Sequence, residues 1–295
     1  MRVNFLVNEV ANGWEPTDTR LGGTEESVVR WAEELVKRGH EVEVYKNASE
    51  YLDSVYKGVG YSERWRYEGG GDVCINIKSS EVDPKEPTLY LTNETDATNK
   101  DLSKYLGVIW PSEWCVDNIP VNNPKTFVLP HGYDPEAIYP DKKVPKQCFY
   151  ASSPDRGLET LLEAWPKVHE AHPDATLILT YGGKSDLPGV ISLGECDEDT
   201  MNEVYKTSEY WLHPCNGGEL YCITGIKAQA AGCWPVIIPT MALSETVKYG
   251  KFSTKETYAD DLVAELGQTH LIPAVSLPTW ESTTDELLKI IESVV

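Results

Sequence analysis

The sequence predicts an α/β protein made of two doubly wound, Rossmann-like domains. The chain has 295 residues, at the roughly 250–300 where single hydrophobic cores usually stop growing. Short apolar, β-branched runs alternate with amphipathic stretches, which is typical of strands and helices that alternate around a parallel sheet. A segment with three prolines and no periodicity, 131–147, separates two such sets and is typical of a linker.

The first set begins with a strand–helix–strand unit. VNFLV (3–7) and EVEVY (41–45) are predicted strands, and GGTEESVVRWAEELVKRG (22–39) is a predicted amphipathic helix between them. Such a unit is normally right-handed, with parallel strands. Further strands are predicted at 73–77, 88–92, 106–110 and 126–130.

The second set repeats the alternation after the linker. Helices are predicted at 157–172, 198–208, 224–232 and 279–295, and strands at 147–152, 176–181, 209–214 and 234–238. In open α/β sheets ligands bind where strands lead into helices, so the functional residues are expected in those loops.

Composition limits the partners and the compartment. A net charge of −21 opposes nucleic acid and anionic lipid as main partners. No apolar run approaches the roughly 20 residues that span a bilayer, and the amino terminus has the pattern of a strand rather than a signal peptide. Seven scattered cysteines without a C-x-x-C pair favour a reducing compartment. We therefore expect a soluble cytoplasmic protein without a transmembrane anchor.

The first candidate site is the glycine pair Gly22–Gly23. Glycines at a helix amino terminus let backbone N–H groups approach a phosphate or a sugar. An equally weighted alternative is a simple turn with Thr24 as helix cap. A nicotinamide-dependent dehydrogenase is rejected, because G-x-G-x-x-G is absent and Tyr45 and Lys46 stand where the ribose-binding acid belongs.

The second and third candidate stretches follow strands of the second set. Arg156 stands at the entrance of a helix, where a guanidinium and backbone N–H groups can together bind a diphosphate. Glu219 lies in a glycine-rich loop and can accept hydrogen bonds from sugar hydroxyls. The N–H groups of Leu220, Tyr221 and Cys222 then lie near a helix amino end, which suits phosphate.

Three segments together resemble the retaining glycosyltransferases of family 4: GGTEESVVRWAEELVKRGHEVEVY, YASSPDRGLETLLEAW and GGELYCITGIKAQAAGCWPV. The resemblance implies a GT-B fold, in which two Rossmann-like domains face a central cleft and the carboxyl-terminal helix crosses back to the first domain. The expected domains are an acceptor-side domain, 1–135 with the returning helix 279–295, and a nucleotide-sugar donor domain, 146–278.

The resemblance also implies roles for individual residues. Gly22 and Gly23 would lie near the donor phosphates, Arg156 would bind the diphosphate, and Glu219 would contact the hexose as the first acid of an E-x7-E motif. Lys227 stands at the second acid, a departure from the pattern that bears on the donor ribose. A basic residue usual before the arginine is also missing, and Lys184 or Lys227 is expected to supply its charge.

For the chemical step, the family often has a His-Asp pair after the fourth or fifth strand. Asp96 corresponds to the acid, the histidine is absent, and His131 is another candidate. Developing charge on the diphosphate would be stabilised by Arg156 and backbone dipoles, without a metal. The acids of 197–199 are expected to cap a helix rather than to bind a metal.

The sequence thus predicts a hexosyltransferase that uses a nucleotide-diphosphate sugar, UDP favoured over GDP, as substrate and needs no cofactor. The acceptor is expected to be a glycan or another soluble molecule. Two alternatives stay open. One is a nucleotide-sugar epimerase of the same fold, and the other is a degenerate carbohydrate- or nucleotide-binding relative without catalysis.

Overall fold

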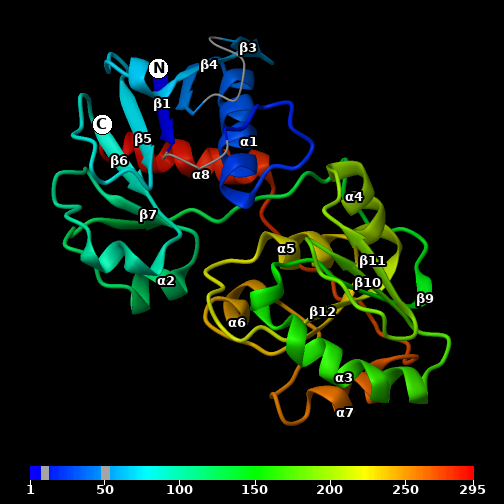
Figure 1. The fold of residues 1–295 in the computed structure, drawn as a ribbon. Coiled ribbons are helices and arrows are strands. Elements are labelled where there is room, and N and C mark those ends of the chain that lie inside the picture. Colours follow the sequence, from blue (N-terminus) through cyan, green and yellow to red (C-terminus); the bar gives the residue numbers. More distant parts are fainter. Residues whose placement is uncertain (8–12, 48–53) are drawn as a thin grey trace. The chain divides into compact units, whose positions relative to one another are not determined.

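The computed structural model describes residues 1–7, 13–47 and 54–295. The chain divides into two compact units: unit 1 comprises Met1–Gly132 and Pro278–Val295, and unit 2 comprises Tyr133–Leu277. Each unit is an α/β structure with its own sheet, as predicted (Figure 1).

Unit 1 contains an eight-stranded sheet. Its strands are β1 (Arg2–Val7), β2 (Glu41–Lys46), β3 (Ser54–Tyr56), β4 (Val59–Glu63), β5 (Val73–Ile77), β6 (Thr88–Leu91), β7 (Val108–Trp110) and β8 (Thr126–Val128). Their order is β3-β4-β2-β1-β5-β6-β7-β8. All neighbours are parallel except β3 and β4. That hairpin was not predicted from the sequence, whereas the six strands predicted for the first set are present.

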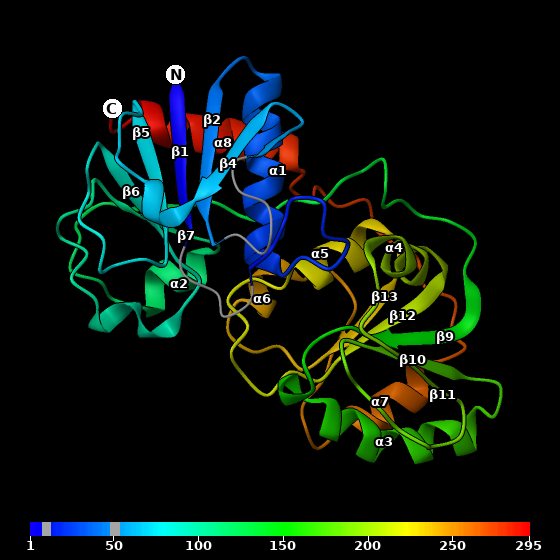
Figure 2. The same ribbon diagram turned by 45° about the horizontal axis from the view of Figure 1, so that its top comes forward.

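Two helices cover one face of this sheet. They are α1 (Gly23–Lys37) and the carboxyl-terminal α8 (Trp280–Glu292), which lie side by side in Figures 1 and 2. Trp31 of α1 meets Trp280 of α8 edge to face, with ring centroids 5.9 Å apart. Leu287 is fully buried in the same core. The last helix therefore completes the core of unit 1, as predicted. Unit 1 also has the short helices η1 (Arg64–Arg66), η2 (Thr95–Asn99) and α2 (Glu113–Asn118).

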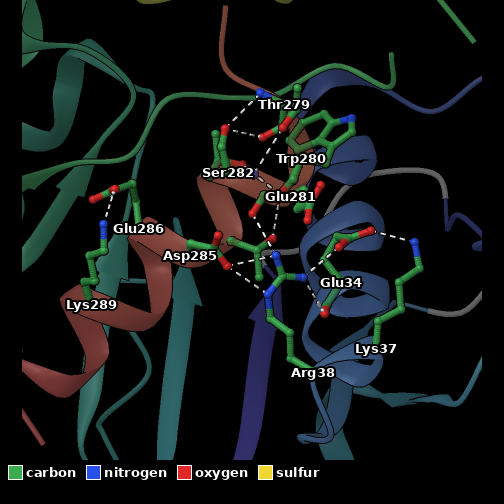
Figure 3. A network of polar contacts seen from close by, with 12 residues as sticks. Glu34, Lys37, Arg38, Thr279, Trp280, Glu281, Ser282, Asp285, Glu286 and Lys289 are labelled. Carbon is green, nitrogen blue, oxygen red and sulfur yellow. Dashed lines mark hydrogen bonds and ion pairs between the residues drawn. The ribbon is translucent and has the colours of Figure 1, made fainter. Parts of the chain in front are cut away.

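A polar network ties the exposed side of α1 to α8 (Figure 3). The Arg38 guanidinium donates to Glu34 Oε2 at 2.7 Å and to Asp285 Oδ1 at 2.9 Å. It also donates to the backbone oxygen of Glu281 at 2.9 Å. One arginine thus binds a carboxylate of each helix. The pairs are partly exposed, so we expect them to orient α8 more than to stabilise it.

Unit 2 contains a six-stranded sheet in which all pairs are parallel. Its strands are β9 (Val144–Tyr150), β10 (Thr176–Thr180), β11 (Val190–Gly194), β12 (Ser208–His213), β13 (Trp234–Ile237) and β14 (Lys251–Phe252). Their order is β11-β10-β9-β12-β13-β14. Alternate side chains enter different cores, because Cys148 and Tyr150 pack with one set of helices and Phe149 with the other.

Helices cover both faces of this sheet (Figure 1). α3 (Leu158–Ala171) and α7 (Tyr258–Glu265) pack on one face, and α4 (Glu198–Thr207) and α5 (Ile223–Ala230) on the other. The short helices η3 (Pro154–Arg156) and α6 (Leu243–Thr246) lie in loops. Among the described residues, none of the helices has the length and apolar character needed to cross a bilayer.

The segment predicted as a linker is largely built into unit 2. Ile138 is 3% exposed and lies in a core cluster of that unit. The Lys143 ammonium donates to the backbone oxygens of Tyr205, Lys206 and Ala231. The sequence of this segment shows no helical or strand periodicity, which is why it resembled a linker. It is attached to unit 2 by individual groups, the buried Ile138 side chain and the Lys143 ammonium, and not by an apolar face.

We predict that Leu287→Ala lowers the free energy of unfolding by about 3 kcal/mol, because it leaves a cavity in a closed core. Lys289→Ala, an exposed position in the same helix, should change it by less than about 0.5 kcal/mol. Urea unfolding followed by circular dichroism measures both. Equal effects of the two substitutions would contradict the packing described for α8.

Candidate functional site

In the sheet of unit 2 the chain leaves two neighbouring strands, β9 and β12, in opposite directions. From β9 the chain moves outward to β10 and β11, and from β12 it moves the other way to β13 and β14. β9 and β12 are neighbours and parallel, so their carboxyl ends lie together. Ligands of open α/β sheets bind at such a switch point. The loops that follow these two strands carry Arg156 and Glu219.

The structure brings Arg156 and Glu219 together. Arg156 Nη1 lies 3.2 Å from Glu219 Oε1 and donates to the backbone oxygen of Gly217 at 3.4 Å. The side chains are 31% and 13% exposed, so the pair is shielded but reachable from solvent. Gly218 has φ +80°, and a Cβ there would lie 2.8 Å from Arg156 Nη1. This glycine therefore serves both the turn and the close approach of the guanidinium.

A buried histidine stands behind this pair and was missed in the sequence analysis. His213, the last residue of β12, is 1% exposed, and its Nε2 lies 3.8 Å from Glu219 Oε1. Its ring stacks on Trp211 with centroids 5.3 Å apart. Burial alone would lower the pKa of His213, but Cys215 and Glu219 outweigh it and raise that pKa. The only sequence signal was its place at the end of an apolar strand that leads into a glycine-rich loop.

The loop ends at the amino terminus of α5. The side chains of Leu220 and Tyr221 are buried, so any contact of these residues with a ligand would come from the backbone; that contact stays a prediction. Cys222 caps α5 with φ 73° and ψ 80°, a left-handed conformation that is uncommon outside glycine. Thr224 Oγ1 donates to the backbone oxygen of Ala151 at 3.1 Å and so joins α5 to the loop after β9.

The two predicted lysines lie in different elements of unit 2. Lys184 follows a strand of the sheet, and Lys227 lies in the helix α5. Lys184 is exposed in the loop that follows β10, which neighbours β9. Lys227 lies within α5, four residues after the first residue of that helix. Both remain expectations for the positive charge of the site.

Unit 1 has a switch point of the same kind between β1 and β5. Gly22 is the N-cap of α1 with φ −69°, and Gly23 is the first helical residue. Thr24 does not cap the helix. Its hydroxyl instead accepts a hydrogen bond from Lys78 Nζ at 3.1 Å. Lys78 directly follows β5, has φ 63°, and burial lowers its pKa. It is a second functional candidate that the sequence analysis missed.

His131, a predicted catalytic candidate, is a core residue of unit 1. It is 5% exposed and stacks on Trp31 with centroids 5.7 Å apart. Its Nδ1 lies 2.7 Å from Ser27 Oγ, and that hydroxyl donates to the backbone oxygen of Gly23. Nδ1 must then donate to Ser27 Oγ, and burial, which lowers the pKa of the ring to about 4, keeps it neutral near pH 7. The ring thereby supports the glycine pair. We therefore assign His131 a structural role rather than a catalytic one.

Asp96 lies in η2 and its side chain is 64% exposed, 3.7 Å from Lys100 Nζ. The structure places no described site residue in contact with it, so its proposed role rests on the resemblance alone. The acids of 197–199 behave as expected, because Asp197 caps α4 and accepts a hydrogen bond from Thr200 N at 2.9 Å.

Solved structures with the same fold cover nearly the whole chain. Sucrose-phosphate synthase from Thermosynechococcus elongatus matches at 12% identity over 99% of this chain and 94% of that one, with a TM-score of 0.72. WaaG, a glycosyltransferase involved in lipopolysaccharide biosynthesis, matches at 14% identity over 100% of both chains, with a TM-score of 0.69. HepE of Anabaena, in complex with UDP and glucose, matches at 13% identity over 99% of both, with a TM-score of 0.67.

The chain therefore has the GT-B fold, as the sequence predicted. No protein-family model matches the sequence, and a search of curated proteins finds no significant match.

We predict that His131 makes unit 1 acid-sensitive. Burial lowers the pKa of His131 to about 4, whereas the unfolded chain protonates near 6.5. Its contribution to stability is therefore present above pH 6.5 and is lost as the pH falls from 6.5 toward 4. Between pH 7 and pH 5 the loss is about 2 kcal/mol.

The variant His131→Asn keeps a hydrogen-bond donor for Ser27 but has no ionisable ring. Its free energy of unfolding should therefore fall about 2 kcal/mol less than that of the wild type between pH 7 and pH 5. Urea unfolding at both pH values measures the difference. An identical fall in the wild type and the variant would contradict the assignment.

Proposed function

We propose that this chain is a glycosyltransferase that moves a hexose from a nucleotide-diphosphate sugar, UDP-linked in preference to GDP-linked, to a glycan or other soluble acceptor. The observation that carries the proposal is the Arg156–Glu219 pair at the switch point of unit 2. The full-length likeness to glycosyltransferases, one of which was solved with UDP and glucose, supports it.

The two side chains suit the two parts of such a donor. The Arg156 guanidinium offers a planar fork of N–H donors that matches a diphosphate. Glu219 accepts hydrogen bonds from sugar hydroxyls through its carboxylate oxygens. In the structure these groups neutralise each other, and a bound donor would replace their ion pair with one contact for each. Because Arg156 is 31% exposed, its side chain can turn to a phosphate without leaving a buried vacancy.

Leaving-group departure would depend on positive charge around the diphosphate. Arg156 and the amino end of α5 supply it in our proposal, as preorganised dipoles and charge in a partly dehydrated site. Lys184 or Lys227 would add to it. This arrangement would perform the task that a divalent metal has in other transferases, so we propose that transfer proceeds without a metal. Retention of configuration at the sugar is proposed from the resemblance to retaining glycosyltransferases alone.

Unit 1 would contribute the glycine pair and one cation. Gly22 and Gly23 stand at the amino end of a fifteen-residue helix, which favours negative charge. Lys78 Nζ is fixed beside Thr24 in the first turn. We propose that this loop contacts the donor phosphates and that unit 1 carries the acceptor. A cytoplasmic location is proposed as well, from the scattered cysteines.

Two other functions are consistent with the same site. An epimerase would release a free sugar epimer without any acceptor. A binding protein without catalysis is favoured by one specific observation, Lys227 at the position of the second acid. Against the second alternative, the guanidinium and the carboxylate of the site are held at 3.2 Å by a fitted glycine loop.

We predict that UDP binds the metal-free protein with the same affinity in Mg²⁺ and in EDTA, and that Arg156→Ala weakens it at least tenfold. The loss of a charge-assisted, bidentate contact is the physical reason. Isothermal calorimetry with UDP and GDP measures both. The control is Lys167→Ala, which removes an exposed cation of α3 that pairs with Asp260.

Full UDP affinity in Arg156→Ala, with the control also unchanged, would contradict the assignment of the diphosphate site. If neither nucleotide binds the wild type, the non-catalytic alternative takes precedence.

We also predict that Glu219→Gln separates the sugar from the nucleotide. Affinity for UDP-glucose should fall toward that for UDP, since the charged acceptor of sugar hydroxyls is lost, at about 1.5–3 kcal/mol for hydrogen bonds to a charged group. UDP itself should bind nearly as before. Calorimetry with both ligands tests this, and an equal loss for both would show that Glu219 acts only by holding Arg156.

A further inference from the structure

Three possible metal ligands lie together at and after the carboxyl end of β12, and the proposed sugar binding uses only one of them, Glu219. One ligand atom each of His213, Glu219 and Cys222 lies within 4.8 Å of the other two. Imidazole nitrogen, carboxylate oxygen and thiolate sulfur are the ligands that zinc takes in proteins, at about 2.0–2.3 Å. Ligand atoms of a tetrahedral zinc site are then roughly 3.3–3.8 Å apart, so these side chains need only small adjustments to surround one ion.

His213 points independently to a missing ligand. The residue is 1% exposed, and neither of its ring nitrogens has a partner at hydrogen-bonding geometry, although Cys215 and Glu219 lie near enough to raise its pKa. Glu219 Oε1 affects the ring electrostatically but at 3.8 Å is beyond hydrogen-bonding distance. Buried polar atoms are nearly always paired, so an unpaired buried imidazole requires an explanation. Stacking on Trp211 and a tilted contact with Tyr150, with ring centroids 5.9 Å apart, hold the ring in this orientation.

Cys222 supplies the sulfur from the opposite side of the loop. It stands at the N-cap of α5 in a left-handed conformation, φ 73°, so its position is set by the backbone and does not depend on a flexible stem. The residue is partly exposed, in contrast to most cysteines of the chain. Burial raises the pKa of the Cys222 thiol, so an ion that binds there must displace the thiol proton.

We propose that His213, Glu219 and Cys222 form a binding site for a zinc-class divalent ion, with the fourth position open. The thiolate and the carboxylate together balance the two charges of the ion. Arg156 now bonds to Glu219 Oε1 and would move into solvent, as its partial exposure allows. The ion would be an inhibitor, because Glu219 also belongs to the proposed donor site. Only this consequence rests on the proposed function.

The test uses Co²⁺ as a spectroscopic substitute for zinc on the metal-free, full-length protein. We expect a thiolate-to-cobalt charge-transfer band and tetrahedral d–d bands that saturate at one equivalent and disappear when Zn²⁺ is added. Cys222→Ser should abolish the charge-transfer band, and His213→Asn should weaken Co²⁺ binding at least tenfold. The control is Cys196→Ser, another partly exposed cysteine of unit 2, which should leave the band unchanged.

A wild type without the band, or a band that survives Cys222→Ser, overturns the proposal. The wild-type result does not depend on whether a variant folds. A separate arm measures UDP-glucose affinity with and without one equivalent of Zn²⁺, where at least a tenfold loss is expected. If the expected cobalt bands appear but no nucleotide sugar binds, the proposed function is rejected and the proposed metal site is supported.

Discussion

The ion pair between Arg156 and Glu219 is the interaction on which the account of this protein depends. It joins two loops that are 63 residues apart in the chain, and it forms because β9 and β12 are parallel neighbours in the sheet. Neither loop has this geometry by itself. The Gly218 turn allows the guanidinium to approach, and His213 stands behind the carboxylate. The site therefore exists because the strand order places the ends of β9 and β12 side by side. A few side chains in the loops after these strands supply its functional groups.

In our proposals, the same pair takes part in three states of one site, one without a ligand and two with different ligands. Without a ligand, each charge neutralises the other. A diphosphate sugar would engage the guanidinium and the carboxylate separately, whereas a zinc-class ion would take the carboxylate together with His213 and Cys222. The second and third states use Glu219 differently and should therefore exclude each other. Partial exposure of Arg156 is what permits the exchange, since a fully buried arginine could not leave its partner.

Much of this could be predicted from the sequence, and the limits have physical causes. Long periodic segments such as 22–39 and 157–172 became helices near the expected bounds, because one apolar stripe per helix is visible in the sequence. The strands β3, β4, β11 and β14 and the helix α7 were missed. β3 and β11 are edge strands with few buried residues, and β4 has only two buried residues, Val59 and Tyr61, to mark its inner face. Arg156 and Glu219 were found from their positions after strands. His213 and Lys78 were missed because neither belongs to a recognisable motif in the sequence, and only the strand order shows which residues lie beside them.

A crystal structure of the protein with UDP tests the central claim most directly. The account predicts the diphosphate within hydrogen-bonding distance of the Arg156 guanidinium and of the backbone amides that begin α5, with Glu219 released from its ion pair. A diphosphate bound away from the carboxyl ends of β9 and β12, with the Arg156–Glu219 pair intact, would contradict it.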